Sequence, residues 1–301
     1  MNNNDYVYEI LRLQTLAPES DELKALQKHR ADVEGILLEQ FSKSNPTIRY
    51  GGSRAKGTMI KEAYDLDVIC YFRHDDTAAG ETLEEIYNNT AHALAPHYLI
   101  ERKPSALRLK DRNPQQYGVD FHIDVVPGRY IDDSKTDTFL YQSSGEKKRL
   151  KTNLEVHINH VKDSGVIDAI RSNKLWRVRK ALRVKLFALE LLIIELLKDR
   201  QSSGLSHQLE HVWTELRDHS DDITIEDPAN PTGNDLSELL NGSIRSELSS
   251  IAAATLQTLE DAGWQGVFGP LDDKSDHEKF GMLHRAATSV RTPTNPWSPR
   301  A

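Results

Sequence analysis

The sequence has a single cysteine, Cys70, among its 301 residues. A chain with one thiol forms no internal disulfide and builds no zinc site from cysteines, which fits a reducing compartment. Its twelve histidines include no H-E-x-x-H pair, so a zinc site of the metalloprotease kind is not expected either.

Long apolar runs are also missing. The most apolar stretch, residues 186–197, carries Glu190 and Glu195, so it predicts a buried core helix and not a membrane span. The N-terminal residues MNNNDYVYEI lack the charged-then-apolar pattern of a signal peptide. We therefore expect a soluble, cytoplasmic protein with no membrane partner.

A basic excess is lacking as well, since the formal net charge is −8. This argues against extensive nucleic-acid binding, which needs a basic face. Residues 171–185 nevertheless hold seven basic residues and no acid. We expect residues 175–197 to form one unbroken helix with Arg177, Lys180 and Arg183 on its polar face. The basic cluster predicts binding of an anion such as a triphosphate; the alternative is a solvated charged face.

The apolar pattern changes near residue 145. Before it, helical patterns alternate with strand-like segments. The first 45 residues are helical in pattern, with a helix start signal at Ser20, and a second helix is expected at 81–96. The expected strands are 47–50, 64–72, 106–110 and 118–126, the last closed by Pro127-Gly128.

After residue 145 the apolar residues recur at helical spacing, beginning with Leu150, Leu154, Ile158 and Val161. Further helices are expected at 204–219 and 235–262. We therefore predict an α+β fold: a mixed-sheet lobe with a long N-terminal helix (1–145), an all-helical lobe (146–285) with core tryptophans, and a flexible tail (286–301). The cleft between the lobes is the expected site.

Two acids stand in the strand predicted at 64–72. Side chains alternate along a strand, so Asp65 and Asp67 share a face, with Cα atoms about 7 Å apart. Neighbouring carboxylates repel each other unless a cation lies between them. Magnesium prefers oxygen ligands and is often shared with phosphates, so the pair predicts a magnesium site; the alternative is two solvated acids.

The later strand supplies a third acid. Asp120, His122 and Asp124 share one face there, and we favour Asp124 because it lies in an apolar run just before Pro127. Asp120 is interpreted as an acid at the strand start and His122 as a hydrogen-bonded strand histidine.

A small-residue loop precedes the first acidic strand. Gly51-Gly52-Ser53 offers backbone N–H groups and a hydroxyl, which suit phosphate oxygens. Arg54 and Lys56 stand in the same loop. With two metal ions, such a set is sufficient for phosphoryl transfer by positioning and charge neutralisation.

These motifs resemble a known superfamily, the polymerase-β-like nucleotidyltransferases. The resemblance rests on the loop at residues 52–58, on Asp65-Leu66-Asp67, and on residues 122–127 (HIDVVP). In the second half, residues 185–192, 226–234 and 263–269 are similar to the oligoadenylate synthetases and to the cGAS/DncV-like CD-NTases of bacteria.

The resemblance implies a catalytic lobe with a mixed sheet, a helical lobe, ATP or GTP as substrates, and two Mg²⁺ (or Mn²⁺) ions. Asp65, Asp67 and Asp124 would be metal ligands and the catalytic acids. Gly52, Ser53 and Lys56 would bind the nucleotide, with Ser53 on its terminal phosphates. The phosphate-contacting lysine of the family maps to Lys180 or Lys185, and the sequence does not decide between them.

CD-NTases make cyclic di- or trinucleotide messengers in anti-phage defence, so this is the expected activity. A conjugation or regulatory partner is expected at the C-terminal tail. The alternatives are a linear oligonucleotide or tRNA-end nucleotidyltransferase and a non-catalytic nucleotide or RNA sensor. An intact set of three aspartates argues against the sensor.

Overall fold

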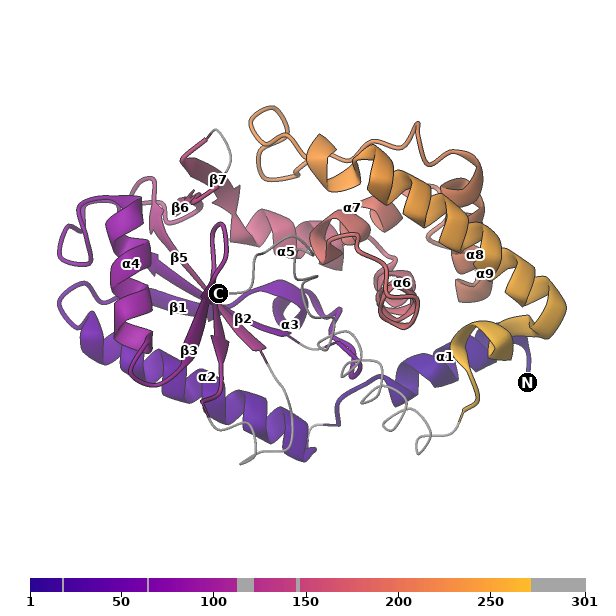
Figure 1. Cartoon of the computed structure of the whole chain (residues 1–301), viewed down its shortest axis with the longest axis horizontal. Helices are drawn as coiled ribbons and strands as arrows, with labels where there is room; N and C mark the ends of the chain where they lie inside the picture. Colours follow the sequence, from indigo (N-terminus) through magenta and orange to yellow (C-terminus); the bar gives the residue numbers. More distant parts are fainter. Residues whose placement is uncertain (18, 64, 113–121, 145–146, 272–301) are drawn as a thin grey trace, which may run out of the picture.

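The computed structural model describes residues 1–17, 19–63, 65–112, 122–144 and 147–271, with the backbone alone at residues 21, 22, 65 and 122. Figure 1 shows a sheet with α2 (Asp21–Gln40) and α4 (Leu83–Leu94) packed on it, and a group of helices beside it. The helix α1 (Asn3–Leu13) lies with the second group, although it begins the chain.

Local capping explains where the first helices begin. The side chain of Ser20 accepts a hydrogen bond from the Leu23 backbone N–H at 3.2 Å, which confirms the predicted start of α2. Thr82 and Glu85 form a reciprocal capping box at α4.

The sheet is mixed, with the strand order β1-β2-β5-β4-β3 and with β6 joining β5 to β7. Only β2 and β5 pair in parallel among the described strands; the other pairs are antiparallel. The strands are β1 (Thr47–Tyr50), β2 (Asp65–Phe72), β3 (Leu99–Arg102), β4 (Leu107–Lys110), β5 (His122–Tyr130), β6 (Asp137–Tyr141) and β7 (Arg149–Asn153).

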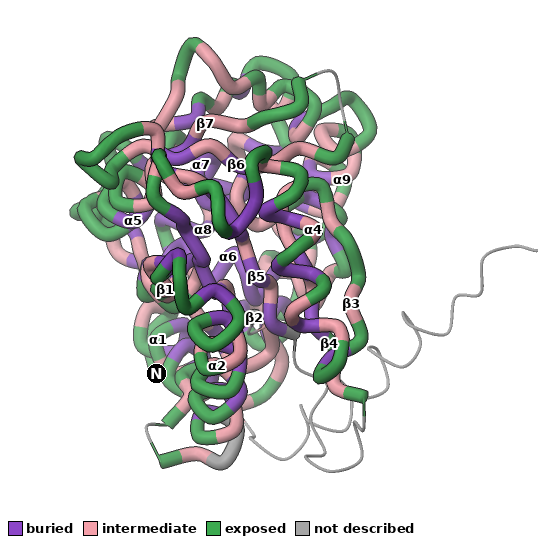
Figure 2. Tube along the Cα trace, turned by 90° about the vertical axis from the view of Figure 1, so that its left-hand side faces the viewer, coloured by how far each residue is buried: buried purple, intermediate pink, exposed green. Residues whose placement is uncertain are grey.

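One face of the sheet is covered by α2 and α4. Leu66, Val68 and Cys70 point to this face and are buried with apolar residues of both helices. Asp67 lies on the opposite face, as the alternation along β2 predicts. Figure 2 shows the buried residues running along β5 and α8 in the interior.

Strand β5 runs past the expected end at Pro127-Gly128, and the prediction of a stop there is wrong. Pro127 lies where β5 changes its antiparallel partner from β4 to β6, so its missing N–H interrupts no antiparallel pair. Gly128 pairs with Leu140 of β6, where the strands approach too closely for a side chain.

The sheet also extends beyond residue 145, where helices alone were expected. Leu150 lies in β7, and the helical spacing that included it is a coincidence of pattern; α5 begins only at Leu154 and ends at Lys162. Strands β3 and β6 were not predicted. Strand β3 is mostly exposed, so it lacks the alternation of buried and exposed residues that indicates a strand.

The expected unbroken helix over 175–197 is two helices, so that prediction is wrong. Ala181 has φ 53°, in the left-handed region, and separates α6 (Ile167–Arg179) from α7 (Leu186–Leu196). Two hydrogen bonds stabilise the turn. The Leu182 N–H donates to the Arg177 carbonyl at 2.9 Å, and Arg177 Nε donates to the Val184 carbonyl at 2.5 Å.

The remaining helices surround a core of aromatic residues. The expected placement of Trp176, Trp213 and Trp264 in the core is confirmed, with neighbouring ring centroids 5.9 and 5.7 Å apart. These helices are α8 (Leu205–Asp218), η2 (Ser237–Leu240) and α9 (Gly242–Phe268), and α1 contributes to the same core. Across the described residues, no helix combines the length and apolarity that a bilayer crossing needs.

The close approach at Gly128 gives a test of the fold. A Cβ atom there would lie 2.7 Å from Leu140 Cδ2 and 2.8 Å from Thr138 Cγ2. We expect Gly128→Ala to lower the free energy of unfolding by about 1–3 kcal/mol, measured by urea denaturation. The control is Gly35→Ala, where nothing lies within 4 Å in the exposed middle of α2; it should raise stability by about 0.5–1 kcal/mol. Equal effects of the two variants would contradict the packing described for β5 and β6.

Candidate active site

Three charged residues stand in a row across the middle of the sheet. In the strand register, Asp67 of β2 is the partner of Asp124 of β5, and Asp124 is the partner of Arg108 of β4. Partners in register point to the same face, so the structure brings together two of the three predicted acids. Asp65 is the register partner of His122; the side chains of both lie outside the described part, as does Asp120 altogether.

Asp124 is held by two cations that the sequence analysis missed. Arg108 donates from Nε to Oδ1 and from Nη2 to Oδ2, both at 2.8 Å. Lys103, in the turn between β3 and β4, has its Nζ 3.8 Å from Oδ2. The alternation Leu107-Arg108-Leu109 shows that Arg108 faces away from the core, but its partner depends on a strand pairing that no local pattern encodes.

The glycine loop closes over Asp67. The Gly51 N–H donates to the Asp67 carbonyl at 2.9 Å, and the short helix α3 (Gly52–Lys56) follows. Gly52 has φ +49°, and a Cβ there would lie 1.5 Å from Asp67 Oδ2. Only glycine fits this position, which brings the start of α3 against Asp67. The predicted contact of Ser53 with a nucleotide stays a prediction.

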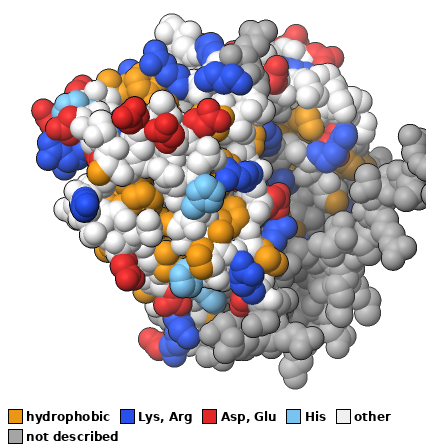
Figure 3. Space-filling model, turned by 60° about the vertical axis from the view of Figure 1, so that its left-hand side comes forward, with side chains coloured by type: hydrophobic (Ala, Val, Ile, Leu, Met, Phe, Trp, Pro, Cys, Tyr) orange, Lys and Arg blue, Asp and Glu red, His pale blue; other side chains and the backbone are white. Residues whose placement is uncertain are grey.

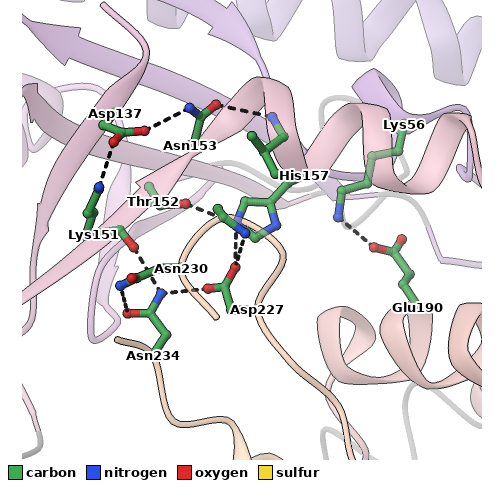
Figure 4. Close-up of polar contacts among 12 residues, drawn as sticks. Lys56, Asp137, Lys151, Thr152, Asn153, His157, Glu190, Asp227, Asn230 and Asn234 are labelled. Carbon is green, nitrogen blue, oxygen red and sulfur yellow. Dashed lines mark hydrogen bonds and ion pairs between the residues drawn. The ribbon is translucent and has the colours of Figure 1, made fainter. Parts of the chain in front are cut away.

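Lys56 is turned into the interior. Its Nζ lies 2.6 Å from Oε2 of Glu190 on α7, in an ion pair with both side chains almost fully buried. Its predicted contact with a nucleotide stays a prediction; in the structure it joins the loop to the helical part (Figure 4).

Thr58 and Lys174 complete this buried cluster. The sequence placed them in the 52–58 loop and in the basic run, but it did not predict their contacts with Glu190. The Thr58 hydroxyl donates to Glu190 Oε1 at 3.0 Å, and Lys174 Nζ lies 3.2 Å from Thr58 Oγ1 and 3.5 Å from Glu190 Oε1. Burial lowers the pKa of Lys174, opposed by the charges of Glu190 and Asp67. Burial would raise the pKa of Glu190, but Lys56 and Lys174 outweigh it and hold that pKa below its usual range.

The basic run at residues 171–185 divides between protein contacts and open positions. Lys180 caps the end of α6 and is half-buried, and Lys185 precedes α7 and is exposed; their nucleotide contacts stay predictions. Other members bind groups of the protein: Lys174 on Glu190, Arg171 on Thr15, Arg177 on Val184, Arg179 on Glu62 and Arg183 on Glu247. The run is therefore largely structural, and the description of Arg177, Lys180 and Arg183 as one helical face is wrong because Ala181 interrupts the helix.

The loop at residues 227–234 is fixed by a second buried cluster, drawn in Figure 4. Asp227 accepts from Asn234 Nδ2 at 2.6 Å and lies 3.4 Å from His157 Nε2 of α5. His157 also contacts Thr152 Oγ1 at 3.1 Å, and its ring packs edge-on against Phe187. Burial lowers the pKa of His157, and Asp227 opposes this.

Asp67 and Asp124 together form an acid row whose oxygen donors fit a hard divalent cation. Asp67 and Asp124 offer carboxylate oxygens from directly paired positions, which suits Mg²⁺ or Mn²⁺. No larger group of three or more histidine, cysteine or acidic ligands occurs among the described side chains, which exclude that of Asp65. Asp65, Asp67 and Asp124 stay the predicted ligands.

Neither a protein-family model nor a curated protein matches the chain. Solved structures do. The CdnC of E. coli MS115-1, solved with ATP, has a TM-score of 0.66 at 18% identity over 90% of this chain and 98% of its own. The CD-NTase CdnG of Bradyrhizobium diazoefficiens, in complex with GTP, has a TM-score of 0.66 at 14% identity over 93% and 99%. Escherichia coli DncV, bound to 3′-deoxy GTP, has a TM-score of 0.59 at 16% identity over 90% and 86%.

The buried ion pairs make a stability prediction. Replacing Glu190 by Gln leaves two lysines buried without their counter-charge, so we expect a loss of about 3–5 kcal/mol in the free energy of unfolding. The control is Glu195→Gln on the same helix, because Glu195 is half-exposed and pairs with Lys198 at the surface; it should cost less than about 1 kcal/mol. Chemical denaturation measures the free energy of unfolding of both variants. If Glu190→Gln lost no more stability than Glu195→Gln, the cluster would not be charged.

A second prediction concerns pH. The pKa of His157 is lowered from its ordinary value of 6.5 in the folded chain. As the pH is lowered, His157 is therefore protonated at a higher pH in the unfolded chain than in the folded chain. The free energy of unfolding consequently falls as the pH falls through about 6.5 and below. We expect the unfolding free energy of His157→Gln to depend less on pH between about 7 and 5 than that of the wild type. Parallel pH profiles for the two proteins would contradict this.

Proposed function

Because the chain has the fold of the CD-NTases, we propose that it is a metal-dependent nucleotidyltransferase that joins nucleoside triphosphates into a cyclic di- or trinucleotide messenger. The observation that carries the proposal is the direct pairing of Asp67 with Asp124. The glycine loop lies beside this pair, and its Gly52 touches Asp67 so closely that no side chain would fit at position 52. A fold shared at low identity does not by itself require an acid pair at this position.

The residues have separate roles in this proposal. Asp65, Asp67 and Asp124 would hold two Mg²⁺ or Mn²⁺ ions, which would supply charge neutralisation at the reacting phosphate. Gly52 and Ser53 bind the terminal phosphates of the donor. The acceptor hydroxyl would give its proton to the carboxylate of Asp124, its oxygen would bond to the α-phosphorus, and the bond from that phosphorus to pyrophosphate would break, which releases pyrophosphate.

The buried cluster behind the loop adds to phosphate binding. Two lysines, Lys56 and Lys174, contact the single acid Glu190, so the cluster contains more basic than acidic groups. Basic groups beside the glycine loop favour binding of a triphosphate there. Lys180 or Lys185 is the candidate for a further phosphate contact from the helical side.

ATP and GTP are the proposed substrates, since structural relatives were solved with them. We propose a role in bacterial anti-phage signalling in the cytoplasm. A structure of CdnC with a HORMA protein supports a protein regulator for this chain too. On the face shown in Figure 3, basic side chains are interspersed with acidic and apolar ones, which favours a small nucleotide acceptor over a long nucleic acid.

The test is incubation of the purified protein with labelled ATP, GTP, CTP and UTP and with Mg²⁺ or Mn²⁺. We expect phosphatase-resistant cyclic products, identified by mass spectrometry, that disappear in Asp65→Ala/Asp67→Ala. The control is Asp221→Ala/Asp222→Ala, two adjacent exposed acids after α8, which should keep full activity.

Full activity of the Asp65/Asp67 double variant would contradict the site. A product sensitive to phosphatase would identify a linear nucleotidyltransferase. Nucleotide binding with no product under any condition would favour a sensor of the same fold.

A further inference from the structure

Asp124 already has a resident cation. Both of its oxygens accept from the guanidinium of Arg108 at 2.8 Å, and Lys103 Nζ lies 3.8 Å from Oδ2. The two-pronged geometry is the strongest form of a carboxylate–arginine contact. The Asp124 side chain is 14% exposed and that of Arg108 20% exposed, so water screens the pair only in part.

The charge of Arg108 affects how strongly Asp67 and Asp124 attract a divalent metal ion. Across the sheet, Asp67 and Asp124 are balanced by Arg108 and Lys103, so these four groups together carry no net charge. A divalent ion that binds Asp124 must compete with Arg108 for the same oxygens. A triphosphate would add negative charge to the site and shift this competition toward the metal.

We infer that Arg108 is a positioning residue that acts through Asp124. It holds the Asp124 carboxylate beside Asp67 before metal arrives, and it weakens metal binding until a nucleotide is present. Metal and nucleotide then bind with positive coupling, because each supplies the charge that the other needs. The inference rests on the proposed role of Asp124 as a metal ligand.

Metal affinity tests the inference without any reaction. Mn²⁺ binding is measured by isothermal titration calorimetry, with and without a non-hydrolysable ATP analogue, for the wild type, Arg108→Gln, Arg108→Lys and Arg217→Gln. Arg217 is the matched control, since it pairs with Asp218 at an exposed site on α8.

We expect Arg108→Gln to bind Mn²⁺ about tenfold more tightly than the wild type without nucleotide, and the analogue to add less to its affinity. Arg108→Lys keeps the charge but loses the two-pronged contact, so its affinity for Mn²⁺ should lie between that of the wild type and that of Arg108→Gln. Arg217→Gln should match the wild type. A role of Arg108 in folding alone would not tighten metal binding.

Thermal unfolding provides a second readout. Without metal, Arg108→Gln leaves the neighbouring carboxylates of Asp67 and Asp124 with less positive charge beside them, so its Tm should lie below that of the wild type. Addition of Mn²⁺ should raise the Tm of Arg108→Gln more than that of the wild type. If Arg108→Gln does not fold, Arg108→Lys serves for both measurements.

Equal or weaker Mn²⁺ binding by the Arg108 variants, with Mn²⁺ bound by the wild type, would overturn the inference and leave the proposed function intact. No Mn²⁺ binding by any of the proteins, with the analogue present, would overturn both.

Discussion

The parallel pairing of β2 with β5 is the constraint on which the candidate site depends. It places Asp67 directly beside Asp124, although the two lie 57 positions apart in the sequence. The register is fixed from the other face, where Leu66, Val68 and Ile123 are buried under α2 and α4. A slip of β2 by one residue would turn Asp67 into that core and the apolar residues of β2 to the open face, so packing of the core and geometry of the site specify the same register.

A buried ionic cluster connects this sheet to the helical part. Lys56 and Thr58 come from the glycine loop, and Lys174 and Glu190 come from α6 and α7, so the four residues join segments more than 100 residues apart. Such pairs contribute little net stability, but breaking one is costly. Their effect is to fix how the loop stands relative to the helices, and any phosphate held by the loop takes its position from this cluster.

The alternation of side chains was enough to predict β2 and its acidic face, because a strand with one buried face has a regular period. The preference for Asp124 came instead from the apolar run around it before Pro127. The pairing of Asp124 with Arg108 and the burial of Lys174 follow from contacts between distant segments, which local patterns do not contain. The break at Ala181 was missed because an alanine at φ 53° is rare and gives no signal of the kind that glycine gives. Pro127 and Gly128 gave the opposite error: residues that usually end a strand are tolerated here, where β5 exchanges one partner for another.

The central claim is that the acid row binds divalent metal together with a nucleoside triphosphate. Its most direct test is a crystal structure of the protein grown with Mn²⁺ and a non-hydrolysable ATP analogue, with Mn²⁺ located by anomalous diffraction. We predict two Mn²⁺ ions bound by carboxylate oxygens of Asp65, Asp67 and Asp124, with the triphosphate against Gly52 and Ser53. Nucleotide bound elsewhere, or an acid row without Mn²⁺ and with Arg108 still on both oxygens of Asp124, would contradict it.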